Sequence, residues 1–297
     1  MPAAFLKRAA ALSKCLFHDY FMTQVKVSVC RICYNEVNNG EGALYRLKQT
    51  TKGGIMKTPE TMEQDDSNMT VGGFVADDYR TAGVFEKYGI DFCCGGKITL
   101  SDACREKEID TATILAEIRA AKEEPQERSQ NYGSWGLPFL ADYIVNTHHG
   151  YLNENTRQIA VYANKIAEVH GSHHPEVIEI ARIFDRIAID MEAHLHEEEE
   201  VLFPAIKRID AARKEGSEPD GGDLKVLKEC LEKLHQDHDA IGDAVHSIRD
   251  LSHRYAIPED ACNTFVVTYR KLKEFEDDLH KHVHLENNIL FPKAARL

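Results

Sequence analysis

The C-terminal part of the chain contains four stretches in which apolar residues recur with a helical period. Within 137–166, 180–202, 224–248 and 265–289, apolar side chains follow one another at spacings of three and four residues. Such residues share one face of an α-helix, which has about 3.6 residues per turn. Gly and Pro interrupt the pattern between the stretches. The pattern predicts an all-α domain over 137–297, an up-down-up-down four-helix bundle.

The apolar faces of these predicted helices are interrupted by His and Glu. The second and fourth helices each carry a His-x-x-x-Glu pair on one face, and the first and third each carry a single His. The six residues are His148, His194, Glu198, His238, His282 and Glu286. Burying four imidazoles and two carboxylates without a metal would have a large desolvation cost. The arrangement therefore predicts two divalent cations bridged by the two carboxylates at one end of the bundle.

The two His-x-x-x-Glu pairs belong to a repeated segment. HLHEEEEVLFP at 194–204 and HVHLENNILFP at 282–292 share the pattern H-x-H-x-E-x-x-V/I-L-F-P. The repeat indicates two equivalent helix pairs around a shared centre. Its second histidines, His196 and His284, fall on another helix face, so they are expected beside the site or at the surface. His170 and His174 stay open as additional ligands. Five further histidines of the bundle region are expected to be solvated, namely His149, His235, His246, His253 and His280.

The segments before the bundle have a different character. Residues 1–69 are an atypical extension, for which two explanations stay open: disorder, or natural translation from Met56. Residues 70–125 show short helical patterns between Gly-rich turns and predict a small helical domain, and the polar segment 126–136 predicts a linker. The net charge of -13 argues against nucleic acid and membrane surfaces as partners. Eight scattered Cys suit a reducing cytoplasm.

The ligand types narrow the choice of metal. Imidazole with carboxylate suits Fe, Mn, Zn or Cu. Ferritin-like di-iron bundles use mainly carboxylates with a Glu-x-x-His spacing, whereas this chain has more His and the wider, reversed His-x-x-x-Glu. The pattern favours a hemerythrin-like centre that is accessible to ferrous iron and able to bind small diatomic molecules.

Four segments of the chain together resemble the repair-of-iron-centres family. They are YGIDFCCGGKITL, HLHEEEEVLFP, HDAIGD and HVHLENNILFP. This family comprises di-iron proteins that repair iron–sulfur clusters damaged by oxidative or nitrosative stress, and the resemblance covers about residues 70–297. It implies two non-haem iron ions held by the same six residues, with Glu198 and Glu286 as bridging carboxylates. It also implies a cytoplasmic homodimer with damaged iron–sulfur proteins as partners.

The resemblance includes the adjacent Cys93 and Cys94, followed by Gly95 and Gly96. Backbone N–H groups beside the thiols are expected to form an anion-binding nest that lowers their pKa. The two thiols are therefore candidates for a redox or iron-transfer role. Two alternatives to cluster repair stay open: a nitric oxide or oxygen sensor or carrier, and a nitric oxide reductase. The sequence leaves open whether the protein is an enzyme.

Overall fold

The computed structural model describes residues 66–123 and 131–297. All described residues belong to a single compact unit. The predictions for residues 1–65 lie outside the described residues. Within the described ranges the elements are helical, apart from an isolated bridge between Thr70 and Thr99. The all-α prediction is confirmed.

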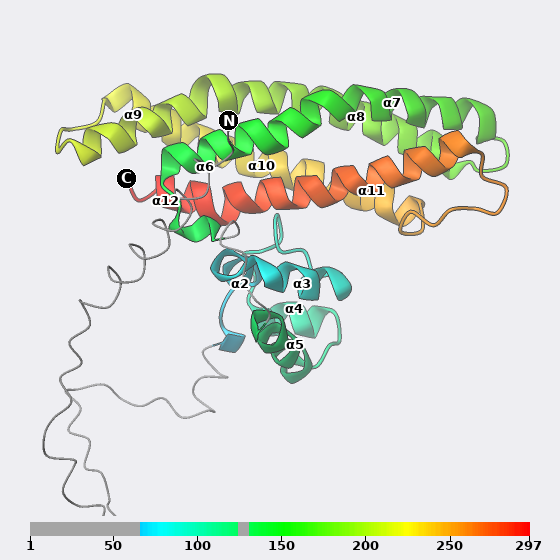
Figure 1. The fold of residues 1–297 in the computed structure, drawn as a ribbon, viewed down its shortest axis with the longest axis horizontal. Helices are drawn as coiled ribbons and strands as arrows, with labels where there is room; N and C mark the ends of the chain where they lie inside the picture. The colour runs from blue at the N-terminus through cyan, green and yellow to red at the C-terminus, as the bar shows by residue number, and fades with distance from the viewer. Residues whose placement is uncertain (1–65, 124–130) are drawn as a thin grey trace, which may run out of the picture. The chain divides into compact units, whose positions relative to one another are not determined.

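The C-terminal region forms four long helical rods, whose arrangement is drawn in Figure 1. Three of the rods contain a π-helical turn. The first rod consists of α6 (Leu137–Ile144), the turn Val145–His149 and α7 (Gly150–His170). The second consists of α8 (Glu176–Glu197), the turn Glu198–Leu202 and α9 (Phe203–Lys214). The third is α10 (Gly221–Leu251). The fourth consists of α11 (Asn263–His284), the turn Leu285–Leu290 and α12 (Phe291–Ala294).

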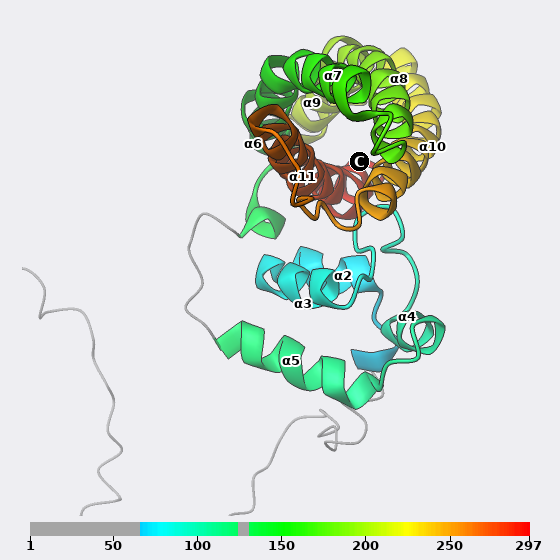
Figure 2. The same ribbon diagram turned by 90° about the vertical axis from the view of Figure 1, so that its right-hand side faces the viewer.

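The rods surround a common interior, which is visible along their length in Figure 2. Helix α7 packs against α8 and α11, and α8 also packs against α10. The buried apolar side chains fall into two clusters. One cluster includes Ile187, Ile241 and Leu279, and the other includes Ile144 and Leu202. The buried His and Glu residues of the rods lie between these clusters, so the polar layer has apolar packing on both sides.

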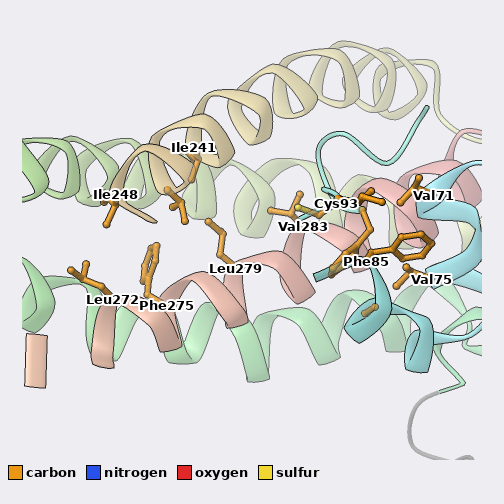
Figure 3. Packing of buried hydrophobic residues seen from close by; sticks show 14 of the residues in the cluster. Val71, Val75, Phe85, Cys93, Ile241, Ile248, Leu272, Phe275, Leu279 and Val283 are labelled. Atoms are coloured by element: carbon orange, nitrogen blue, oxygen red, sulfur yellow. The ribbon is translucent and has the colours of Figure 1, made fainter. Parts of the chain in front are cut away.

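The small domain precedes the bundle in sequence. It contains α2 (Val71–Asp77), a 3₁₀ turn (Tyr79–Thr81), α3 (Ala82–Lys87), α4 (Leu100–Glu106) and α5 (Thr111–Glu123). The Thr70 and Thr99 hydroxyls cap α2 and α4 by accepting backbone N–H bonds, which satisfies donors that a helix start leaves free. Its core residues belong to the same cluster as residues of α10 and α11, as Figure 3 shows for Phe85 and Val283.

The loop that carries the two cysteines lies directly against the bundle. Asn288 Nδ2 donates to the Phe92 carbonyl at 3.1 Å. A Cβ on Gly72 would lie 2.2 Å from Asn288 Oδ1, and one on Gly96 would lie 2.3 Å from the Phe92 oxygen. Only glycine fits at such close approaches. None of the described helices combines the length and apolar character needed to cross a membrane.

Candidate metal centre

Two groups of side chains share the same pair of carboxylates inside the bundle. One group brings His149 and His282 to Glu198 and Glu286, and the other brings His194 and His238 to the same two glutamates. In each group, one candidate ligand atom per residue lies within 4.8 Å of all the others. Each carboxylate therefore faces both groups, as a bridge between two cations requires.

The distances support this bridging geometry. Glu286 Oε1 lies 3.1 Å from His282 Nε2, and its Oε2 lies 3.2 Å from His238 Nε2. Glu198 Oε2 lies 3.4 Å from the Nε2 atoms of both His149 and His194. Pairs of imidazole Nε2 atoms also approach each other, at 3.2 Å for His149 and His282 and 3.0 Å for His194 and His238.

The carboxylates have no other partners to balance their burial. Glu198 and Glu286 are each 0% exposed. Apart from these imidazoles, none of their four oxygens has a hydrogen-bond partner among the described residues. Buried charged oxygens are costly unless they are paired or coordinate a metal. The donor set of imidazole nitrogens and carboxylate oxygens suits first-row divalent metals, so these residues fit the cations that the sequence predicts.

The Nδ1 atoms of two of the clustered histidines have hydrogen-bond partners outside the clusters. His149 Nδ1 lies 2.8 Å from Glu199 Oε1, and His238 Nδ1 lies 2.9 Å from Asn287 Oδ1. In both pairs the ring N–H donates to the oxygen, which leaves Nε2 as the available lone pair. This arrangement is typical of metal-binding histidines, whose other nitrogen donates to a carboxylate or carbonyl oxygen.

The structure differs from the sequence prediction on the first rod. It places His149, predicted to be solvated, in the cluster, and His149 is 0% exposed. The reason is the π-helical turn Val145–His149. A π turn bonds each residue to one five positions away instead of four, so the interior position after Ile144 shifts by one residue.

His148 lies beside the cluster instead of within it. Its ring stacks on that of His282 with centroids 5.8 Å apart, and its Nδ1 lies 2.9 Å from Asp278 Oδ1. Its Nε2 is buried and without a hydrogen-bond partner in the described structure. The ligand role of His148 stays a prediction. The ligand roles of the other five sequence-predicted residues also stay predictions, but the structure brings these five together.

Prolines account for two of the three π-helical turns. Pro204 and Pro292 follow the turns Glu198–Leu202 and Leu285–Leu290 closely. Proline lacks an N–H and its ring displaces the carbonyl four residues earlier, which disturbs the α-helical bond there. The first turn is followed by Gly150 and α7 without a proline, so its one-residue shift has no comparable mark in the sequence. The adjacency of His148 and His149 was the signal that could have found it.

The buried ion pairs shift the pKa values of the site residues strongly. Burial opposes charging of His149 and His238, but Glu198 and Glu286 outweigh it and raise their pKa values to about 10 and about 9. Burial also disfavours the charged form of Glu286, but the neighbouring His282, His149 and His238 hold its pKa well below the usual range. Without metal, protonated imidazoles balance the carboxylates.

Other predicted neighbours of the site have definite positions. His284 is fully buried, burial lowers its pKa to about 3, and its Nδ1 accepts from Asn288 Nδ2 at 3.1 Å. His196 is exposed. His170 ends α7, which separates it from His149 by about 30 Å at ~1.5 Å per residue. His170 instead contacts His174 and Cys262, so neither residue reaches the centre.

The cysteine pair contacts the wall of the centre. Cys94 Sγ lies 3.2 Å from the His238 carbonyl oxygen, and a Cβ on Gly242 would lie 2.9 Å from that sulfur. Asn287, which supports His238, also lies 3.5 Å from the Cys93 carbonyl through its Nδ2. Residues far apart in sequence thus bring the thiols to the backbone of a candidate ligand.

The predicted anion-binding nest is already filled by a side chain of the protein. The Asp91 carboxylate accepts the backbone N–H groups of Cys93 and Cys94 at 2.8 and 3.1 Å through Oδ1, and that of Gly95 at 3.0 Å through Oδ2. The prediction of a lowered thiol pKa is wrong for Cys93. The adjacent Cys94 thiol and burial raise its pKa well above the usual range.

The geometry predicts different consequences for the two adjacent histidines. We expect His149→Ala to lower metal affinity by at least about tenfold, because losing an imidazole costs no less than losing its supporting partner. His148→Ala should have a smaller effect. Metal content per chain after equilibrium dialysis measures both, with exposed His196→Ala as the control. A greater loss in His148→Ala would instead assign the ligand role to the residue on the α-helical stripe.

The pKa shifts predict a pH dependence for the metal-free protein. A histidine whose pKa is raised on folding contributes stability below its unfolded value of about 6.5, and this contribution disappears as pH rises through the folded value. The free energy of unfolding should therefore fall between about pH 6.5 and the pKa of His149, about 10. Urea denaturation across this range measures it. Protein loaded with Zn²⁺ should lack this decline, because coordinating imidazoles carry no proton at Nε2. An equal decline in both forms would contradict the assignment.

Comparisons with known proteins agree with this arrangement. Residues 140–294 match the family described as the hemerythrin HHE cation binding domain, and residues 67–122 match a domain described as of unknown function, DUF542. The chain is 32% identical over 225 residues to the iron-sulfur cluster repair protein ScdA of Staphylococcus haemolyticus, covering 76% of this chain and 97% of that protein. It is 31% identical over 232 residues to the iron-sulfur cluster repair protein YtfE of Yersinia pestis, covering 78% and 99%.

These matches extend over both described domains, the small one with the cysteine pair and the bundle with the His and Glu clusters. The curated relatives are matched over nearly their whole length. The family predicted from the sequence motifs is therefore confirmed: the chain belongs to the iron–sulfur cluster repair proteins that carry a hemerythrin HHE cation-binding domain.

Proposed function

We propose that this chain repairs iron–sulfur clusters damaged by oxidative or nitrosative stress, and that it does so by supplying iron from a centre of two iron ions. The observation that carries the proposal is the buried pair Glu198 and Glu286, whose oxygens face four imidazoles and have no other hydrogen-bond partner in the described structure. The names of the relatives indicate the task, which is the repair of iron–sulfur clusters. The imidazole and carboxylate donors are compatible with iron as the metal that is supplied.

The protein residues have distinct parts in this proposal. His149 and His282 would hold one iron and His194 and His238 the other, with the carboxylates of Glu198 and Glu286 within reach of both pairs. Iron at this centre supplies the metal that a damaged cluster has lost. The supporting partners Glu199 and Asn287 keep the Nε2 lone pairs turned inward. The apolar clusters on both sides limit water at the carboxylates.

Release of iron removes positive charge from the centre, and the buried carboxylates then need another positive charge to balance them. The same imidazoles that bind metal can take up protons, and the carboxylates raise the pKa of two of them. Protons can therefore replace part of the positive charge that leaves with the metal. This gives the centre a metal-free form in which its buried carboxylates stay balanced, as a protein that gives up iron requires.

The small domain provides a contact that a simple oxygen or nitric oxide carrier does not need. Cys94 Sγ reaches the His238 carbonyl oxygen, and Cys93 lies beside it. We propose that these thiols act in the transfer of iron between the centre and the damaged cluster. A cysteine that binds iron loses its proton to solvent, and the resulting thiolate is a soft ligand for iron in clusters. Damaged iron–sulfur proteins are the proposed partners, with nitric oxide or oxygen as candidate ligands of the centre.

Repair activity should depend on the bridging carboxylates. We expect iron-loaded protein to restore a hydro-lyase whose 4Fe–4S cluster has lost iron, without added iron. Glu198→Ala should lower this activity at least about tenfold through loss of bound metal, whereas exposed Glu200→Ala on the same turn should retain it. Recovery of hydro-lyase activity against iron content is the measurement. Full repair by metal-depleted Glu198→Ala protein would contradict the proposal, as would turnover of nitric oxide with no repair.

The cysteine pair should affect transfer more than binding. We expect Cys93→Ser and Cys94→Ser to slow repair several-fold while iron content stays unchanged, because neither sulfur lies in the two His and Glu groups. Exposed Cys262→Ser, at the far end of the bundle from the centre, is the matched control. Stopped-time repair assays at equal iron loading separate rate from capacity. Unchanged repair rates in both cysteine variants would assign them a purely structural role.

A further inference from the structure

A cleft of about 700 Å³ lies between the cysteine loop and the bundle. Its lining includes Asp91 and Phe92 from the loop, together with residues of α10 and α11. Among the latter are His246, Glu276 and His280. None of these three belongs to the two groups that share the bridging glutamates of the centre.

The three side chains converge on one point. One candidate ligand atom from each lies within 4.8 Å of the other two. Glu276 Oε1 lies 3.8 Å from His280 Nε2, one helical turn later on α11. The rings of His246 and His280, from different helices, have centroids 5.7 Å apart. Two imidazoles and one carboxylate are a donor set that binds divalent zinc or iron and leaves other coordination positions open.

Two further observations point to a ligand at this place. His280 Nε2 is buried and has no hydrogen-bond partner among the described residues, so its lone pair or proton is unmatched. His246 is partly exposed to the cleft, whereas the Glu276 side chain is 6% exposed. A cation could therefore be reached from solvent while being held by a buried carboxylate.

We propose that His246, Glu276 and His280 form a second metal site, which takes a labile divalent cation such as Fe²⁺ or Zn²⁺ at the cleft. Solvent fills the remaining coordination positions. Lability follows from the neighbouring Arg249, whose Nε lies 2.6 Å from Glu276 Oε1. The guanidinium competes with a metal for this carboxylate and repels it, which weakens binding relative to the centre.

The site has a structural connection to the centre. Asp91 lines the cleft, and its Oδ1 lies 3.0 Å from Cys93 Sγ. Cys93 and Cys94 sulfurs are 3.7 Å apart, and Cys94 Sγ lies 3.2 Å from the His238 carbonyl. Insofar as the proposed repair function holds, the cleft site is an exchange position where iron enters or leaves. The site itself does not depend on that function.

The test uses the full-length protein loaded with Zn²⁺ and then treated briefly with a chelator to empty the weaker cleft site. This protein is titrated with Co²⁺ and followed by visible absorption. We expect one further ion per chain, bound reversibly and removed by brief exposure to a chelator that leaves the central ions in place. His246→Ala and His280→Ala should each weaken this binding at least about tenfold. Exposed His196→Ala is the control and should bind as the unchanged protein does.

A second variant tests the competition directly. Arg249→Gln should tighten Co²⁺ binding, because it removes the positive charge that occupies Glu276. The far-ultraviolet circular dichroism of each variant, compared with that of the unchanged protein, verifies that the variant is folded. No further ion, or equal affinity in folded His246→Ala and His280→Ala to that of the unchanged protein, would overturn the proposal. Binding of the ion by protein that repairs no cluster would support the site and contradict only the proposed function.

Discussion

The carboxylates of Glu198 and Glu286 are buried among imidazoles, and the interior of the bundle is arranged around the balance of their charge. Neither carboxylate has another hydrogen-bond partner in the described structure, so balance comes from metal or from protons on the surrounding histidines. Four rods must supply those groups at one level. Apolar clusters pack on either side of that level.

The same constraint makes the centre able to exist in two forms. With metal bound, neutral imidazoles and anionic carboxylates form a coordination set. Without metal, the raised pKa values of His149 and His238 allow these rings to stay protonated near neutral pH. Apolar residues in place of the buried His and Glu residues would bind neither metal nor protons, so the bundle would have a single form. The proposed release of iron depends on both forms.

The small domain extends the polar layer outward. Gly72 allows α2 to approach Asn288 closely, and Gly96 allows the cysteine loop to approach its own backbone at Phe92. Gly242 on α10 allows the Cys94 side chain to approach that helix closely, beside the carbonyl of His238. The loop, the cleft and the centre therefore form neighbouring parts of one region, although the cysteines and α11 are far apart in the chain.

The sequence by itself determined the helical rods and most of the site. Periodicity identifies each rod because apolar burial along a helix is a local property of spacing. Five of the six predicted residues lie in the clusters. Four of them form the two His-x-x-x-Glu pairs, a spacing that places both side chains on one face whatever the helix packs against. The fifth, His238, follows the apolar stripe of its own helix. The repeated segment carries this signal twice.

The tertiary structure decided what local spacing does not encode. A π-helical turn after Ile144 places His149 in the cluster and His148 beside it. The loop's N–H groups bind Asp91 instead of an external anion, and the adjacent Cys94 thiol together with burial raises the pKa of the Cys93 thiol. These outcomes depend on how the folded chain packs around each group. Their free energies come from burial and charge pairing, which a one-dimensional pattern of residues cannot specify.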